Sequence, residues 1–391
     1  MLDLGFVSAI LPNKSLDEVL AFAQKEHFAC VEVMCWPSEN ADTRRYAGVS
    51  HISVDALSHD ELLALKDKLA NQPVKISALG YYPNPMDPDE KQASFYRNHI
   101  KKIIKAASVL GIGNVNTFVG RDFTKNIDYN ISKFKEVWPE IIDLADSLHI
   151  KIGIENCPMF FSDDEWPGGK NLATTPKIWD QLFSIIPSNN FGLNYDPSHM
   201  VWQMMDYLYP IYAYKDKLHH IHLKDVKVYQ DKLNQVGILA NPLEYHSPKI
   251  PGLGDIHWGS FISALNDVRY RGPIVIEVED KAYEGSDEDI VKSCRKHTIF
   301  SWSAQGKIDP IPMTKAKGCY FWDANGKKYF DMNSQLMCVN VGHGHPKVIQ
   351  AIKDQAEELA FAGPAFATKI RAEVGPMLAK HTPGDLDKFF F

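Results

Sequence analysis

Four side chains of the types that bind divalent cations lie at the ends of four short apolar segments. They are Glu155 in GIENCP, Asp196 in NYDPSH, His222 in HHIHLKD and Glu277 in IVIEVED. Three carboxylates and one imidazole offer mostly oxygen ligands, which favours Mn²⁺, Mg²⁺ or Co²⁺ over Zn²⁺, because zinc in structural sites prefers sulfur and nitrogen. The four residues therefore predict a metal site, provided that the fold brings them together.

A metal held in this way would act as a Lewis acid on a carbohydrate. It would bind two adjacent oxygens of the sugar, polarise the carbonyl and acidify the neighbouring C–H. Glu155 and Glu277 would then serve as the paired acid and base. Removal of a proton on one face and its return on the other is epimerisation, whereas transfer between two carbons is aldose–ketose isomerisation. A sugar lyase is a close variant, because the same proton abstraction can end in elimination.

The segments that carry these residues belong to a regular alternation of strands and helices. Amphipathic helical segments such as SLDEVLAFAQKE, with its serine cap, separate the strands. Eight β-then-α units fit an α/β fold of the (β/α)8 TIM-barrel type, in which all strand ends point into one mouth, better than an open doubly wound sheet. The eight apolar segments expected as strands are residues 2–8, 29–35, 74–80, 114–120, 150–155, 191–196, 218–224 and 273–279.

The segment HHIHLKD, residues 219–225, is the most polar of the expected strands. Alternation along a strand predicts that His220, His222 and Lys224 face the barrel interior, while the residues between them pack against helices. His222 would bind the metal, and Lys224 would lie at the rim and contact substrate oxygens. Two roles stay open for His220: a hydrogen bond to a metal ligand, or a structural place in the core.

Composition narrows the classes of function. A net charge of −7 without a basic stripe argues against nucleic acid as a partner. Six dispersed cysteines without a C-x-x-C pair indicate reduced thiols, and the sequence has neither a signal peptide nor a run of about 20 apolar residues. We therefore expect a cytoplasmic protein that acts on a small molecule and has no membrane partner. A homo-oligomer stays compatible with the sequence.

The motifs named so far, with MCWP (34–37), ISALGYYPNP (76–85), NVNTFVGRD (114–122) and IPGLGDIHW (250–258), resemble the sugar phosphate isomerase/epimerase family of xylose-isomerase-like TIM barrels. The resemblance runs from residue 1 to about 297. It implies that the four residues above bind the metal and that the two glutamates are catalytic. It also implies four substrate-binding residues: Trp36, Asn156, His199 and Lys224. The family name leaves open whether the sugar carries a phosphate.

Other interpretations of the barrel fit its residues less well. The superfamily resembles endonucleases that cut DNA at abasic sites, for which His199 and His257 would be spare zinc ligands, but the basic DNA-binding surface is lacking. GLGDIH lacks the third glycine of a dinucleotide-binding fingerprint. Arg121 and Asp122 either bind substrate or pair with each other. A barrel that binds sugar without converting it is a further alternative.

After residue 297 the pattern changes, which predicts two domains, 1–297 and 298–391. The second part reads as a strand, a turn around DANGKK, a second strand and an amphipathic helix from about Val348 to Leu359. It is similar to the start of a class III aminotransferase, a pyridoxal-phosphate enzyme of fold type I, which implies an α+β appendage. In that family the turn containing His343 and His345 is structural. The join has no linker, and a natural bifunctional precursor, a frameshifted gene and a fused or mispredicted reading frame all fit.

The aminotransferase resemblance stops before the parts that hold the cofactor. The phosphate-binding loop, the aspartate that faces the pyridine nitrogen and the Schiff-base lysine have no counterparts. We therefore do not expect this chain to bind pyridoxal phosphate, and the segment would be an inactive transaminase fragment. We also expect residues 298–391 to pack poorly, so that limited proteolysis removes them before it cuts the barrel.

Overall fold

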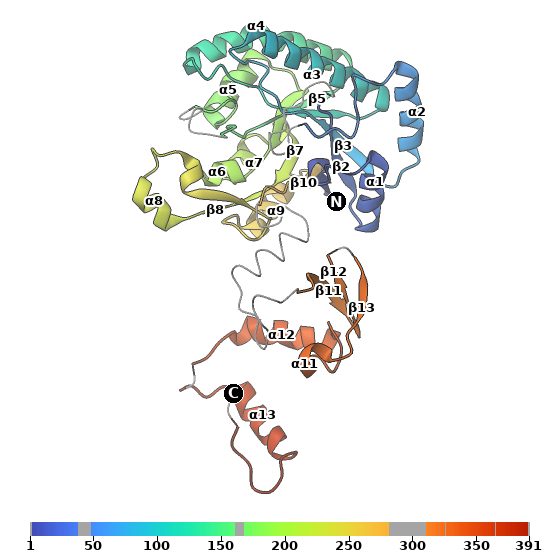
Figure 1. The fold of residues 1–391 in the computed structure, drawn as a ribbon. Helices are drawn as coiled ribbons and strands as arrows, with labels where there is room; N and C mark the ends of the chain where they lie inside the picture. The colour runs from blue at the N-terminus through green and yellow to red at the C-terminus, as the bar shows by residue number, and fades with distance from the viewer. Residues whose placement is uncertain are drawn as a thin grey trace. The chain divides into compact units, whose positions relative to one another are not determined.

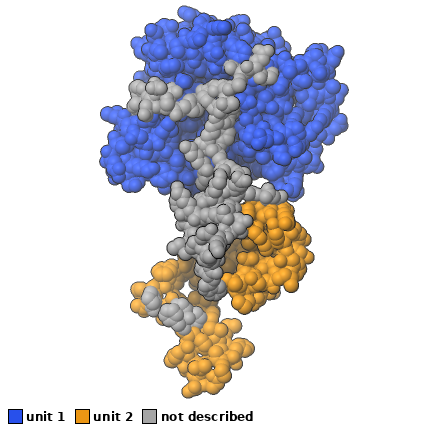
Figure 2. All heavy atoms as spheres, viewed as in Figure 1, with its two compact units in different colours: residues 1–284 blue, residues 285–391 orange. Residues whose placement is uncertain are grey.

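The computed structural model describes residues 2–37, 48–160, 168–280, 310–324, 326–363 and 365–389. The chain forms two compact units, residues 1–284 and 285–391 (Figure 2). None of the described helices combines the length and the apolarity that are needed to cross a membrane.

Eight parallel strands close into a barrel in the first unit (Figure 1). Strands β1 to β7 pair in the order of the chain, and β10 closes the ring between β7 and β1. All eight expected strands are present, so the predicted (β/α)8 barrel is confirmed and the open sheet is wrong. The barrel strands are β1 Asp3–Val7, β2 Cys30–Met34, β3 Lys75–Gly80, β4 Asn114–Thr117, β5 Lys151–Glu155, β6 Phe191–Tyr195, β7 Leu218–Leu223 and β10 Pro273–Ile276.

Helices cover the outside of the strands (Figure 1). Ser15 and Glu18 form a capping box at the start of the first helix, as the sequence predicts. The third long helix ends at Gly111, whose φ of +75° suits a residue without Cβ. The helix expected near Ser286 lies outside the described residues. The helices are α1 Leu16–Lys25, α2 His59–Ala70, α3 Glu90–Leu110, α4 Ile127–Ser147, α5 Pro176–Ile185, α6 Ser198–Val201, α7 Tyr209–Ala213 and α9 Trp258–Asp267.

A hairpin that the sequence did not predict follows β7. Strands β8 (Asp225–Val228) and β9 (His246–Lys249) are antiparallel and enclose α8 (Gln230–Val236). The buried carboxylate of Asp225 ties the later loop 250–258 to the end of β7. It accepts hydrogen bonds of 2.9–3.2 Å from the backbone N–H groups of Val226, Gly252 and Ile256 and from the indole N–H of Trp258. Asp225, the last residue of HHIHLKD, thus holds the loop 250–258 in place.

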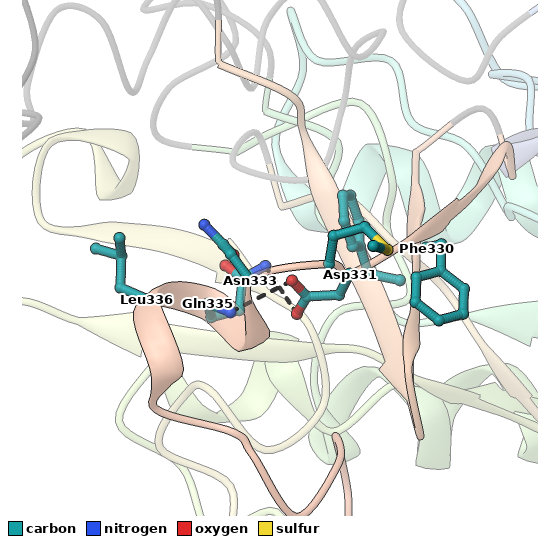
Figure 3. Close-up of a pocket in the computed structure, with 7 residues that line it drawn as sticks. Phe330, Asp331, Asn333, Gln335 and Leu336 are labelled. Atoms are coloured by element: carbon teal, nitrogen blue, oxygen red, sulfur yellow. Dashed lines mark hydrogen bonds between the residues drawn. The ribbon is translucent and has the colours of Figure 1, made fainter.

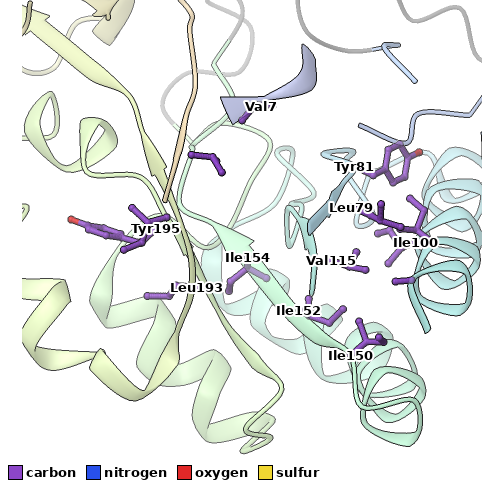
Figure 4. Close-up of a cluster of buried hydrophobic side chains, with 14 of the residues drawn as sticks. Val7, Leu79, Tyr81, Ile100, Val115, Ile150, Ile152, Ile154, Leu193 and Tyr195 are labelled. Atoms are coloured by element: carbon purple, nitrogen blue, oxygen red, sulfur yellow. The ribbon is translucent and has the colours of Figure 1, made fainter. Parts of the chain in front are cut away.

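The core lies between the barrel strands and the surrounding helices (Figure 4). Trp138 of α4 is fully buried, and its ring centroid lies 5.9 Å from that of Phe191 on β6. Its indole N–H donates to the carbonyl of Val119 at 3.1 Å. One side chain therefore joins a helix to β6 and to the segment that follows β4.

Trp138→Ala should lower the free energy of unfolding by about 3–5 kcal/mol, because it opens a cavity and leaves the Val119 carbonyl without its donor. Chemical denaturation measures this change. Tyr129→Ala on the same helix is the matched control, because Tyr129 is exposed, and we expect a change within about 0.5 kcal/mol. Equal effects of the two substitutions would contradict this account of the core.

The second unit contains, within its described residues, a three-stranded antiparallel sheet and three helices. The strand–turn–strand around DANGKK is confirmed, and the amphipathic helix follows it. Four apolar side chains of that helix, Val348, Ile349, Ile352 and Leu359, are exposed. The elements are β11 Met313–Lys317, β12 Tyr320–Asp323, β13 Lys328–Phe330, α11 Ser334–Met337, α12 Pro346–Leu359 and α13 Lys369–Ala379.

Asp331 organises the turn after β13. Its carboxylate accepts two hydrogen bonds of 3.3 Å from Gln335, one from the backbone and one from the side chain (Figure 3). The same carboxylate lies 2.7 Å from His343 Nε2. His343 therefore has a structural partner in this turn, as expected.

Candidate active site

The four predicted metal ligands lie at the same end of neighbouring strands. Glu155 is the last residue of β5, Asp196 follows β6, His222 is the penultimate residue of β7, and Glu277 follows β10. These strands are adjacent in the barrel in the order β5, β6, β7, β10. Because they are parallel, their ends meet at one rim of the barrel.

Distances between the side chains are short. His222 Nδ1 lies 3.5 Å from Glu155 Oε1 and 3.1 Å from Glu277 Oε2. Asp196 joins this group through Lys224, whose Nζ is 2.9 Å from both Asp196 Oδ2 and Glu277 Oε2. Glu155, Asp196 and His222 are buried, and Glu277 is partly buried. The structure thus forms two neighbouring groups of possible ligands that share Glu155: Glu155, His222 and Glu277 in one, and Glu155, Asp196 and His199 in the other.

Three of the four side chains present a buried atom that makes no hydrogen bond within the described part of the chain. These atoms are Glu155 Oε1, Asp196 Oδ2 and His222 Nδ1. Leaving a buried polar atom without a hydrogen bond costs about 1–3 kcal/mol. Each atom is of a kind that binds divalent cations. A cation beside Glu155 and His222 would satisfy both of these atoms, whereas Asp196 Oδ2 belongs to the neighbouring group with Glu155 and His199 and lies 2.9 Å from Lys224 Nζ. The residues present therefore fit a divalent metal.

Glu32 of β2 is a candidate site residue that the sequence did not predict. Its Oε2 lies 2.7 Å from His222 Nε2, and its Oε1 accepts a hydrogen bond from Tyr82. Glu32 is fully buried. A carboxylate on one imidazole nitrogen fixes the ring and directs the other nitrogen toward a metal. The available signal was a single acid within the apolar segment CVEVM.

Glu32→Gln should weaken metal binding about 10- to 100-fold, because the amide holds the His222 ring less firmly and makes it a poorer ligand. Calorimetric titration with Mn²⁺ measures the affinity. The control is Glu61→Gln, which alters an exposed carboxylate in the cap of α2. If the Glu32 variant bound Mn²⁺ with unchanged affinity, Glu32 would not support His222 as a metal ligand.

His220 lies in the interior beneath the proposed ligands. Its Nδ1 is 3.0 Å from Asn194 Oδ1, and its Nε2 is 3.1 Å from Ser77 Oγ on β3. Its ring meets that of His222 edge to face, with 5.8 Å between the centroids. His220 therefore extends the polar group behind His222 and supports that ring. These contacts across the barrel agree with the alternation expected for HHIHLKD.

His199 lies beside two of the proposed ligands. Its Nε2 is 3.1 Å from Asp196 Oδ2 and 3.8 Å from Glu155 Oε1. Trp202 donates its indole N–H to His199 Nδ1 at 3.2 Å. Since Nδ1 accepts this bond, Nε2 carries the proton and points toward the acids. This arrangement makes His199 a hydrogen-bond donor, which a substrate oxygen can use.

Of the remaining substrate-binding predictions, Asn156 and Lys224 contact this group of side chains. Asn156 makes two hydrogen bonds with the backbone of Asp196, at 2.8 and 2.9 Å, and so positions that residue. Lys224 is 2 % exposed and contacts the acids directly, deeper than a place at the rim would imply. Trp36, the second residue after β2, is buried, and its ring meets Tyr81 edge to face at 4.9 Å between centroids.

Two further sequence candidates have structural partners elsewhere. Arg121 donates to the carbonyls of Gly168 and Lys125, while the carboxylate of Asp122 accepts from Thr124. His257, a spare zinc ligand in the endonuclease interpretation, is exposed and caps α9 by accepting from the N–H of Ser260 at 3.1 Å.

The two glutamates differ in their electrostatic surroundings. Burial raises the pKa of Glu155, and the negative charge of Glu277 raises it further. Burial also tends to raise the pKa of Glu277, but the nearby Lys224 and His222 outweigh burial and lower the pKa of Glu277 to about 2. Glu155 therefore holds a proton more readily, whereas Glu277 stays ionised.

Comparison with known proteins gives two separate matches along the chain. Residues 20–297 match the family described as xylose isomerase-like TIM barrel, and residues 302–391 match aminotransferase class-III. The uncharacterized protein YfiH of Bacillus subtilis is 26% identical over 314 residues, which is 71% of this chain and 92% of that protein. A probable mitochondrial ornithine aminotransferase of Caenorhabditis elegans is 37% identical over 71 residues, 18% of this chain and only 17% of that protein's length.

Solved structures resemble the barrel. An IOLI protein with a bound zinc atom has a TM-score of 0.54 at 17% identity, over 75% of this chain and 96% of that one. A D-tagatose 3-epimerase-like protein has a TM-score of 0.51 at 20% identity, and the match covers 75% of this chain and 96% of that one. The probable 3-DHS dehydratase AsbF of Bacillus anthracis has a TM-score of 0.51 at 16% identity, and the match covers 75% of this chain and 97% of that one. At such identities the likeness establishes the fold. Because the first family model spans most of the sequence, the chain belongs to the xylose isomerase-like TIM barrel family, with a short class III aminotransferase segment after the barrel.

Proposed function

We propose that the barrel is a divalent-metal-dependent isomerase or epimerase that acts on a small carbohydrate, phosphorylated or free. The observation that carries this proposal is that Glu155 lies in two adjoining groups of possible ligands, one with His222 and Glu277 and one with Asp196 and His199. Glu155, Asp196 and His222 each have a buried ligand atom that lacks a hydrogen bond within the described residues. Mn²⁺, Mg²⁺ or Co²⁺ suits this ligand set best. When bound, the metal would supply Lewis-acid polarisation of a carbonyl.

The side chains of the chain perform the proton transfers in this proposal. Glu277, a carboxylate that stays ionised and is the more exposed of the two glutamates, is the base that takes the proton from the carbon beside the carbonyl. Glu155, whose pKa is raised, holds and returns a proton. His199, through its Nε2–H, and Lys224, through its ammonium, orient the substrate oxygens. Glu277 is more exposed than the buried Glu155, so substrate approaches from its side.

The solved relatives support this class of reaction and keep one variant open. One neighbour is named for a 3-epimerase and another for a dehydratase, and both share this barrel. Abstraction of a proton next to a carbonyl is common to epimerisation and to elimination. A sugar lyase that uses the same site is therefore the alternative proposal.

The test is incubation of the Mn²⁺-loaded protein with a panel of free and phosphorylated ketoses in deuterated water. Incorporation of deuterium next to the carbonyl is the expected result. An epimer, an aldose or a dehydrated product then identifies the reaction as epimerisation, isomerisation or elimination. Binding of sugar without deuterium incorporation across the panel would instead support a barrel that binds sugar without converting it.

A further inference from the structure

Lys224 lies at the centre of the acidic side chains of the site. Its Nζ is 2.9 Å from Asp196 Oδ2 and from Glu277 Oε2, and 3.9 Å from Glu155 Oε1. The side chain is 3% exposed. A buried ammonium is stable only where carboxylates compensate its charge, so these contacts hold the side chain in place. All three acids are also proposed metal ligands.

A divalent cation and this ammonium compete for the same oxygens. The Asp196 carboxylate accepts a hydrogen bond from Ser198 N at Oδ1, while its Oδ2 makes no hydrogen bond within the described residues and faces the Lys224 ammonium. A cation bound by Asp196 and Glu277 meets the positive charge of Lys224 at close range. Repulsion between like charges is strong in a buried site, where water screens it poorly.

Glu279 offers the ammonium another carboxylate. Its Oε2 lies 3.3 Å from Lys224 Nζ, and its side chain is 28% exposed, so it is closer to solvent than Lys224. Glu279 follows Glu277 by two residues and is not among the proposed metal ligands. Because Glu279 already lies within contact distance, the ammonium keeps a carboxylate partner if it loses the deep acids.

We propose that Lys224 and a divalent cation compete for Asp196 and Glu277, and that Glu279 receives the ammonium when the cation binds. This inference rests on the proposed function, because it concerns the same metal site. Lys224 then has two sets of partners, one for each charge state of the site. It compensates the acids before the metal binds, and its transfer to Glu279 sets the metal affinity.

Lys224→Met tests the competition, because methionine nearly keeps the length of the side chain and removes its charge. We expect Mn²⁺ to bind about tenfold more tightly by calorimetric titration, within the usual range of coupling between two binding events. After treatment with chelator, the variant should melt at a lower temperature than the wild type, and Mn²⁺ should abolish this difference. Lys249→Met, which breaks the contact of Lys249 with Asp280 at 3.2 Å, is the control for loss of one positive charge.

A purely structural role for Lys224 predicts a different pattern. In that case the variant would melt early with and without Mn²⁺, by equal amounts, and its Mn²⁺ affinity would match that of the Lys249 variant. Either result would refute the proposed competition between Lys224 and the cation. If the wild type itself bound no Mn²⁺, the proposed function would fail together with this inference. Mn²⁺ binding by the wild type with unchanged affinity in Lys224→Met would refute this inference alone.

Glu279→Gln tests the transfer step. If Glu279 holds the ammonium in the metal-bound protein, this substitution should weaken Mn²⁺ binding about tenfold in the wild type but about twofold or less in the Lys224→Met background. Loss of negative charge alone would lower the affinity equally in both backgrounds. Equal effects would therefore refute the role of Glu279 while leaving Lys224→Met as the separate test of competition.

Discussion

Glu155→Gln should lower the rate of deuterium incorporation into substrate by about 10²- to 10⁴-fold, the contribution typical of one general acid or base. Glutamine keeps the shape of the side chain but neither holds nor returns a proton. It also provides a weaker ligand at a position where Oε1 is buried without a hydrogen bond from the described residues. The measurement is the initial rate of label exchange at saturating Mn²⁺.

Two controls separate loss of chemistry from loss of structure. Glu136→Gln changes an exposed glutamate on α4 and should leave the exchange rate unaltered. Without Mn²⁺, the melting temperature of Glu155→Gln should not fall, because burial already disfavours the charge of Glu155. Label exchange that persisted in Glu155→Gln at the wild-type rate would remove this residue from the mechanism.

Asp196→Asn should weaken Mn²⁺ binding by more than about 100-fold, the upper end of the loss expected for a residue that only supports a ligand. The asparagine side chain keeps the shape and still accepts, through its carbonyl oxygen, the hydrogen bond that Asp196 Oδ1 receives from Ser198 N at 2.8 Å. It loses the negative charge at Oδ2, the atom that faces Lys224 and His199. Calorimetric titration gives the affinity.

The matched control for this substitution is Asp146→Asn. Asp146 accepts hydrogen bonds from Ser188 and Asn190 before β6 begins, at the other end of the strands. We expect its Mn²⁺ affinity to equal that of the wild type. Similar affinities in both asparagine variants would mean that Asp196 does not bind the metal.

The barrel and the proposed ligands could be predicted because both depend on local patterns. Strand-forming segments of four to six residues recur between amphipathic helices, and parallel closure places every strand end at one rim. The position of Glu155 as the last residue of β5 and of Asp196 directly after β6 follows from this rule alone. Only the choice of metal ligands among the polar residues needed the resemblance to a family.

Contacts across the barrel could not be predicted in the same way. The pairing of Glu32 with His222 joins two strands on different sides of the ring, and its geometry depends on how the barrel closes. Lys224 was expected at the rim, but the carboxylates of Asp196, Glu277 and Glu155 hold its ammonium deeper in the barrel. The β8–β9 hairpin was missed because its short strands pair only with each other among the described strands.

The central claim is that Glu155, Asp196, His222 and Glu277 bind one divalent cation. Its most direct test is a crystal structure of the Mn²⁺-loaded protein with anomalous data collected at the manganese edge. We expect a single strong peak within coordination distance of oxygen atoms from all three acids and of His222 Nδ1. A peak elsewhere in the chain, or no peak in crystals that contain saturating Mn²⁺, would contradict it.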